Sequence, residues 1–272
     1  MSWQPGFGSR GFLRFVAVSL VTVAVAFGLY ACKNSDEPGV VAIGLTDTPG
    51  DFLSYTVDVT SLTLTKADGT FVQTLPQRTR VDFAQIVDLT EFMTGATIPA
   101  GTYVSATLNL DYSNADIQVD DGNGVPVPVA PANIHDSQGV QVTTLSMTVT
   151  LDNARQLVIA PLRPSLLDLD FNLAASNFVD MSGINPLVTV NPLLVADVNP
   201  DAPKPHRIRG PLDGVDTQAS SFTLILRPFN LLQGAHGRVA FFTDSNTTFE
   251  IDQVNYVGSA GLSALAAKSQ MD

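Results

Sequence analysis

The sequence TYVSATLNL at residues 102–110 carries the clearest strand pattern in the chain. From Val104 to Leu110, apolar side chains recur at every second position, with Ser, Thr and Asn between them. Successive side chains of a β-strand point to opposite faces, so the alternation gives one apolar face and one hydroxyl-rich face. The stretch therefore predicts a half-buried strand that covers a core.

Similar alternation extends along the chain on both sides of this stretch. Apolar and β-branched residues recur in short segments separated by Gly, Pro and Asp, at residues 40–45, 55–64, 70–75, 140–151, 166–173 and 187–198. The alternation changes phase near Ser61, which predicts a bulge or a switch between sheets. Pro126 and Pro128 suit an edge strand, because proline lacks the N–H that a central strand needs.

These patterns predict an all-β fold. Many short strands, with no amphipathic helix of three turns before residue 258, are typical of an antiparallel sandwich or barrel. We expect an antiparallel β-sandwich over residues 41–198 and a stiff linker at residues 199–205, which contain three prolines. Residues 206–272 are predicted to form a small β-barrel-like domain. Its length is near the lower limit for a domain with a hydrophobic core of its own, and we expect the domain to be incomplete.

The composition excludes several classes of protein. The 272 residues include 14 Lys and Arg against 26 Asp and Glu, a formal net charge of −12. Nucleic-acid binding is not expected, because phosphate neutralisation needs many basic residues. The single cysteine, Cys32, rules out an intramolecular disulfide and a Cys-rich zinc site.

The N-terminal segment has the organisation of a secretory signal. Residues 1–14 contain two arginines and no acid, and residues 15–29 carry no charge. As a helix, the uncharged run spans about 22 Å at about 1.5 Å per residue, less than the roughly 30 Å of a hydrocarbon core. This order is typical of a signal peptide, with a signal-anchor helix as the alternative.

Residues 29–32, Leu-Tyr-Ala-Cys, resemble the lipobox of bacterial lipoproteins. The resemblance implies a signal peptide at residues 1–31 and acyl chains, such as palmitate, on Cys32. Residues 32–40 would then form a polar, flexible tether to the membrane, and two or more acyl chains give stable anchoring. We therefore expect an extracytoplasmic protein of the cell envelope. By resemblance to enterobacterial lipoproteins, Lys33 directly after the cysteine implies sorting to the outer membrane if the organism is Gram-negative.

A second resemblance covers most of the predicted sandwich. Residues 43–52, IGLTDTPGDF, resemble the opening motif of the DUF4382 family. Further motifs follow in order at residues 57–62, 87–90, 98–103 and 108–111, so that the resemblance covers about residues 41–197. It implies a secreted or lipid-anchored β protein, commonly a lipoprotein, and supplies no catalytic residue. At the C-terminus, residues 241–249 resemble the DUF5666 β-barrel-like repeats.

Loop carboxylates are the candidate metal ligands. Asp47 and Asp51 lie in one turn-rich loop, and Asp120 and Asp121 lie in another. Such oxygen-rich loops would suit Ca²⁺ as a cofactor. The interpretation that we favour is structural, since Asp in such positions accepts hydrogen bonds from its own loop and fixes the turn.

The other titratable residues are predicted to have structural or solvated roles. His135, His206 and His236 are far apart in the sequence and in loop-like contexts, so we expect them to be solvated. Asp168 and Asp170 are two apart on a predicted strand whose apolar residues fill the alternate positions. This amphipathic pattern predicts that both carboxylates lie on a solvent-exposed face.

The functional hypotheses follow from location and fold. The sequence contains no Gly-x-Ser-x-Gly elbow, no His-Glu-x-x-His and no phosphate-binding loop that ends in Gly-Lys-Ser/Thr. We expect no enzyme activity and predict a binding, adhesion or assembly role, with an envelope protein or a glycan as the partner. Two alternatives stay open: a carbohydrate-active or other hydrolase that uses loop carboxylates, and a Ca²⁺-dependent adhesion module.

Overall fold

The structure is a computed structural model that describes residues 37–151, 156–201 and 204–269. Strands make up most of these residues and helices are few, so the predicted all-β fold class is confirmed. The signal peptide predicted at residues 1–31 and most of the tether predicted at residues 32–40 lie outside the described residues.

The stretch that opened the sequence analysis lies in β6 (Gly101–Asp120), the longest strand of the described chain. β6 runs antiparallel to β2 (Phe52–Lys66) along almost the whole length of both strands. The register of this pair shifts between Val59 and Ser61, so the predicted bulge is confirmed. Three of the four predicted inward positions of β6, Ala106, Leu108 and Leu110, are at most 1% exposed, whereas the fourth, Val104, is only half-buried.

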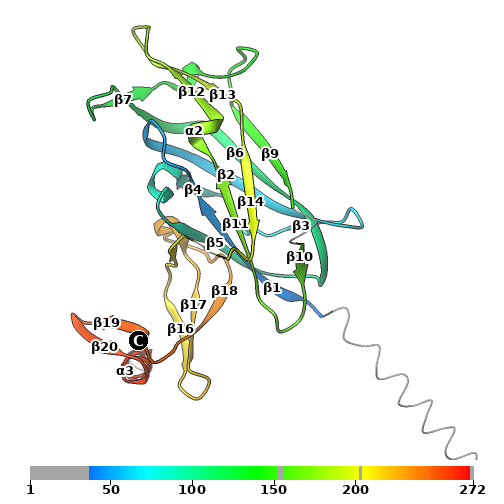
Figure 1. The fold of residues 1–272 in the computed structure, drawn as a ribbon, viewed down its shortest axis with the longest axis vertical. Helices are drawn as coiled ribbons and strands as arrows, with labels where there is room; N and C mark the ends of the chain where they lie inside the picture. The colour runs from blue at the N-terminus through cyan, green and yellow to red at the C-terminus, as the bar shows by residue number, and fades with distance from the viewer. Residues whose placement is uncertain (1–36, 152–155, 202–203, 270–272) are drawn as a thin grey trace, which may run out of the picture. The chain divides into compact units, whose positions relative to one another are not determined.

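Up to Arg207, the strands of the described residues form two main sheets and a smaller third one (Figure 1). Beside β2 and β6, the seven-stranded sheet contains β3 (Phe71–Gln73), β4 (Thr79–Asp82), β7 (Pro126–Val129), β9 (Thr144–Thr150) and β10 (Leu157–Ile159). The five-stranded sheet has the order β14 (Leu194–Val198), β11 (Ser165–Phe171), β1 (Gly39–Thr46), β5 (Thr90–Ile98) and β15 (His206–Arg207). The third sheet has the order β12 (Asn177–Asp180), β13 (Leu187–Val190) and β8 (Ile134–Asp136).

Three strand pairs differ from the antiparallel arrangement that we expected. β1 pairs with β11, β13 with β8, and β15 with β5 in parallel, while the other pairs are antiparallel. Parallel neighbours need a crossover connection of about a dozen residues or more, and over a hundred residues separate β1 from β11. Alternation within one strand carries no information about such distant partners.

One hydrophobic core lies between the two main sheets. It draws buried side chains from β1, β2, β5, β6 and β11. At its centre, the ring of Phe171 on β11 packs edge to face against Tyr55 at 5.9 Å and against Phe83 at 5.3 Å. The Tyr55 hydroxyl lies 2.9 Å from the Tyr112 hydroxyl, so both buried phenols keep a hydrogen-bond partner.

β1 runs along the sandwich from one end towards the other. Figure 1 shows that β1 begins at one end, whereas β7, β12 and β13 gather towards the other, which we call the apical end. The eight residues of β1 span about 26 Å at about 3.3 Å per residue. The loop that follows β1 therefore lies far from the point where the described chain begins.

The C-terminal part contains a three-stranded antiparallel sheet and a separate hairpin. The sheet is formed by β16 (Leu212–Asp216), β17 (Ser221–Ile225) and β18 (Arg238–Phe242). The hairpin is formed by β19 (Thr248–Ile251) and β20 (Val254–Val257), and α3 (Ser259–Ser269) follows it. Within the described residues, the predicted barrel-like region is thus an open sheet beside a hairpin. The remaining short helices are η1 (Phe83–Ile86), η2 (Pro131–Asn133), α2 (Leu173–Ser176) and η3 (Pro228–Asn230).

Residues 204–209, which we call the strap, lie along the edge of the five-stranded sheet. β15 extends that sheet by pairing with β5, and the Thr90 amide donates to the Pro205 carbonyl at 3.0 Å. Glu91 of β5 is fully buried, and its carboxylate binds the guanidinium groups of both Arg207 and Arg209. The described residues from Pro38 onward form one compact unit, and the domain boundary at residues 199–205 stays a prediction.

Candidate functional site

The predicted lipidation site, Cys32, lies outside the described residues. In the described part of the chain, no helix combines the length and apolar character needed to cross a bilayer.

Three of the four candidate metal ligands come together at the apical end. Asp51, Asp120 and Asp121 contribute to one cleft of about 450 Å³, which we call the apical cleft. The cleft lies between the loop after β1, the turn from β6 to β7, and β12, and its other lining residues are Gly50, Leu53, Gly122, Val179 and Met181. The two loops are joined by a hydrogen bond of 3.1 Å from the Asp120 amide to the Asp51 carbonyl.

The carboxylates of the β6–β7 turn are engaged within that turn. Asp120 Oδ1 accepts hydrogen bonds from the Gly122 and Gly124 amides, both at 2.7 Å. Asp121 Oδ1 accepts one from the Asn123 amide at 2.8 Å, a contact that lowers the pKa of this carboxyl. These contacts perform the turn-fixing role that the sequence analysis favours. No group of three or more His, Cys, Asp or Glu side chains that could hold a metal ion occurs among the described residues, and the Ca²⁺ hypothesis stays a prediction.

The fourth candidate, Asp47, lies elsewhere and is buried. Its Oδ1 accepts hydrogen bonds from the Thr48 amide at 2.7 Å and the Leu173 amide at 2.9 Å. Burial raises the pKa of Asp47 to about 7, because desolvation outweighs the two amide donors, which act in the opposite direction. The nearby Asp170 carboxylate adds to the rise.

The substitution Asp47→Asn is expected to remove a pH-dependent part of the stability. A carboxyl whose pKa is raised by folding stabilises the protein fully below its unfolded pKa, which is 3.8 here, and loses that contribution as the pH rises through about 7. Asparagine keeps an oxygen acceptor for the Thr48 and Leu173 amides but does not titrate. Urea unfolding of both proteins at about pH 5 and about pH 8 measures the effect. The same pH slope in wild type and variant would contradict it, since other titrating groups cancel in the difference.

Asp168 and Asp170 are not on a solvent-exposed face, and that prediction was wrong. Pro200 and the strap lie against this face of the sheet, so that Asp168 is buried and His206 Nε2 lies 3.2 Å from its Oδ2. Burial raises the pKa of Asp168, while the His206 charge opposes the rise. Lys204 Nζ donates to Thr46 Oγ1 at 2.9 Å, to the Val87 carbonyl at 2.7 Å and to the Asp47 carbonyl.

The expectation of solvated histidines was wrong for His236 in particular. His236 is fully buried, with Nδ1 2.7 Å from the Met93 carbonyl and Nε2 3.1 Å from Thr79 Oγ1. Burial lowers its pKa. The chain before β18 is held against β5 here, and no local pattern predicts such a contact. His135 and His206 are both half-buried in short strands.

The strap is a structural feature that the sequence analysis did not predict. Four of its six residues are basic, Lys204, His206, Arg207 and Arg209, in a chain with only 14 Lys and Arg. This concentration of basic residues could have indicated that residues 204–209 bind carboxylates elsewhere in the chain, because the chain has many more acidic than basic residues.

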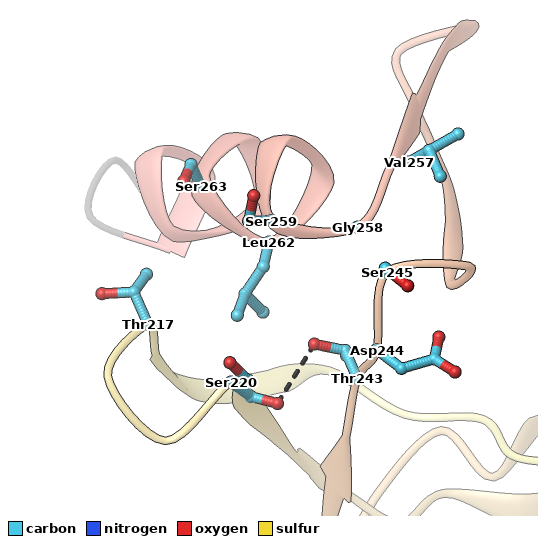
Figure 2. Close-up of a pocket in the computed structure, with 10 residues that line it drawn as sticks. All are labelled: Thr217, Ser220, Thr243, Asp244, Ser245, Val257, Gly258, Ser259, Leu262 and Ser263. Carbon is cyan, nitrogen blue, oxygen red and sulfur yellow. Dashed lines mark hydrogen bonds between the residues drawn. The ribbon is translucent and has the colours of Figure 1, made fainter.

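A further pocket of about 380 Å³ lies in the C-terminal part, between α3, the β16–β17 turn and the loop after β18. Figure 2 shows its side-chain hydroxyls, which come from Thr217, Ser220, Thr243, Ser245, Ser259 and Ser263. Asp244 is the one titratable residue among those lining the pocket, and its Oδ1 accepts hydrogen bonds from the Asn246 amide and Thr247 Oγ1, both at 2.9 Å. Val257 and Leu262 also line the pocket, so its surface is mixed polar and apolar.

These features define an all-β protein with a loop cleft at one end and a strapped, acidic sheet face. The family described as a domain of unknown function, DUF4382, matches residues 38–178, and the chain belongs to this family. The match begins at residue 38 rather than 41 and ends at 178 rather than 197, the limits of the resemblance in the sequence analysis. Comparison with curated proteins and with solved structures found no match.

Proposed function

We propose that this protein is a lipid-anchored, extracytoplasmic envelope protein whose apical cleft binds a partner without catalysing a reaction. The lipobox-like residues 29–32 support the anchor. The observation that carries the binding role is the position of the apical cleft, at the end of the sandwich opposite the start of β1. A tether that ends at β1 would hold this cleft away from the membrane and towards partners.

The lining of the apical cleft supports a mixed polar and apolar partner, such as an envelope protein or a glycan. Leu53 and Met181 are exposed beside the carboxylates of Asp51 and Asp120. Loops on a rigid sandwich commonly carry binding residues, because the scaffold fixes their geometry at low entropic cost. Phe178, on β12 next to the cleft residue Val179, adds an aromatic side chain that is 69% exposed.

One experiment tests both halves of this proposal. A photo-crosslinking amino acid replaces Met181 in the full-length protein, expressed in cells that process lipoproteins, with and without Cys32→Ala. We expect the protein with Cys32 to incorporate labelled fatty acid and to yield a discrete crosslinked adduct. Cys32→Ala should lose the lipid label and the membrane association, because no other anchor is proposed.

The matched control places the same crosslinker at Leu232, which is more exposed than Met181 and lies outside the apical cleft. Equal adducts at both positions, or none at Met181, would contradict the binding role of the cleft. Retention of the fatty-acid label by Cys32→Ala would refute the anchor independently.

A further inference from the structure

The turn between β10 and β11, residues 160–164, lies at the end of the sandwich where β1 begins. β1 and β11 run parallel, with Val41 opposite Ser165, so that the two strands begin side by side. The turn also approaches the first residue of β1, since a Cβ added to Gly39 would lie 2.4 Å from the Ala160 carbonyl oxygen. The turn is therefore at the opposite end of the sandwich from the apical cleft (Figure 1).

Leu162 stands at the tip of this turn, in a backbone conformation that leucine rarely adopts. Its φ is +59° and Pro161 precedes it, as in a type II turn, where Gly or Asn is the usual residue at this position. The Leu162 side chain is 100% exposed, and that of Val158 on β10 is 51% exposed. Leucine is unfavourable here in water, because its backbone is strained and its apolar side chain is fully hydrated. The turn thus presents an apolar tip that nothing in the described residues covers.

The next residue, Arg163, is exposed, and its guanidinium has no hydrogen bond or ion pair in the described residues. Every other Lys and Arg side chain of the described residues contacts a carboxylate or a carbonyl oxygen. Arg163 lines a hollow of about 220 Å³ together with Gln156, Ser165 and Asn199, and none of the lining residues is acidic. An arginine without a carboxylate partner, beside amide groups, is suited to binding a phosphate group.

The length of chain between the proposed anchor and β1 indicates what this turn meets. Gly39 is seven residues after Cys32, and seven residues span no more than about 25 Å at about 3.6 Å per residue. Whatever the conformation of these residues, an acylated Cys32 would keep the start of β1, and the turn beside it, within that reach of the lipid surface. A phospholipid carries its phosphate directly above its acyl chains, so it offers partners for both the apolar tip and the unpaired guanidinium.

We propose that the β10–β11 turn is a second membrane contact, in which Leu162 inserts among the acyl chains and Arg163 binds a lipid phosphate. This inference rests on the lipid anchor of the proposed function and adds an orientation to it. Two contacts at the same end of the sandwich would restrict its tilt on the membrane, so that the apical cleft faces away from the lipid.

The turn contact depends on the anchor, because a single leucine and a single arginine bind a membrane weakly. The net charge of −12 also opposes the approach of the untethered protein to anionic lipids. A tether of a few residues makes the second contact intramolecular, at an effective concentration high enough for a weak contact to form.

Quenching of a single tryptophan by brominated lipids tests this contact. Trp3 is the only tryptophan of the chain and is replaced by Phe, so that Leu162→Trp places the one indole at the turn. The lipidated full-length protein is reconstituted into vesicles of phosphatidylethanolamine and phosphatidylglycerol with brominated acyl chains. We expect the emission of Leu162→Trp to shift to shorter wavelength and to fall at least about twofold, because the indole lies at the membrane interface.

Ile184→Trp is the matched control, since Ile184 is as exposed as Leu162 but lies in the β12–β13 loop at the apical end. Its emission should be neither shifted nor quenched. Adding Arg163→Gln to Leu162→Trp should reduce the quenching in phospholipid vesicles and leave it unchanged in vesicles of a phosphate-free glycolipid. Full quenching in phospholipid after Arg163→Gln would overturn the phosphate contact.

Incorporation of labelled fatty acid separates the failure of this inference from the failure of the anchor. If the protein carries the label but Leu162→Trp is unquenched, or both tryptophans are quenched equally, the turn contact is overturned and the anchor stands. If Cys32 takes up no label, the anchor is overturned together with the contact that rests on it.

Discussion

Phe171→Ala is expected to lower the free energy of unfolding by about 3–5 kcal/mol, the range measured for truncating a buried phenylalanine. Phe171 is fully buried at the centre of the core, and its ring packs edge to face against Tyr55 and Phe83. Alanine would leave a cavity between the two main sheets, and neither neighbouring strand can move to fill it without breaking its pairing. Equilibrium unfolding in urea, at constant m-value, measures the loss.

Phe178→Ala is the matched control for this prediction. Phe178 lies seven residues along the chain and is largely exposed, so its truncation should change the free energy of unfolding by less than about 0.5 kcal/mol. Similar losses for both variants would show that the core is not organised around Phe171.

Glu91→Ala is expected to cost about 3 kcal/mol and to loosen the strap. The fully buried carboxylate binds Arg207 and Arg209 and accepts a hydrogen bond from the Phe229 amide at 3.2 Å. Removing one partner of a buried ion pair costs about 3–5 kcal/mol. We expect the lower end, because the arginine side chains are 35% and 31% exposed and water can solvate them in part.

Two measurements distinguish this effect from a general loss of stability. Hydrogen exchange should accelerate in the strap, residues 204–209, more than in β6, because Glu91 holds the strap and not the central strand pair. Glu250→Ala, at an exposed position of β19, serves as the control and should alter stability by less than about 0.5 kcal/mol. Unchanged exchange in the strap of Glu91→Ala would contradict the assigned role.

Local alternation was sufficient to predict the strands but not what covers their outer faces. Residues 102–110 and the bulge near Ser61 were predictable, because side-chain direction along a strand depends only on the chain's own period of two. The same rule correctly predicted that Asp168 and Asp170 lie on the face of β11 opposite the core residues. It could not show that the strap, more than thirty residues later, would bury Asp168.

For the candidate sites too, local contacts could be predicted from the sequence and long-range contacts could not. The turn roles of Asp120 and Asp121 follow from local Asx chemistry, and the structure contains the corresponding hydrogen bonds. The meeting of both residues with Asp51 depends on the long β2–β6 pairing, which no short window of sequence contains. The burial of His236 depends likewise on a contact with β5, more than a hundred residues earlier.

The central place of β1 has a mechanical consequence. A pull on the N-terminal end of the described chain would act along β1, which is bonded on one side to β11 and on the other to β5. Force along a strand loads the hydrogen bonds of both ladders in shear, so they resist together instead of opening one after another. Forced unfolding is governed by the unfolding rate. We expect the unfolding barrier to be higher for a strand bonded on both sides than for an edge strand bonded on one side. If the protein is tethered at this end, the pairing of β1 with both neighbouring strands would oppose unfolding of the sandwich by a pull on the tether.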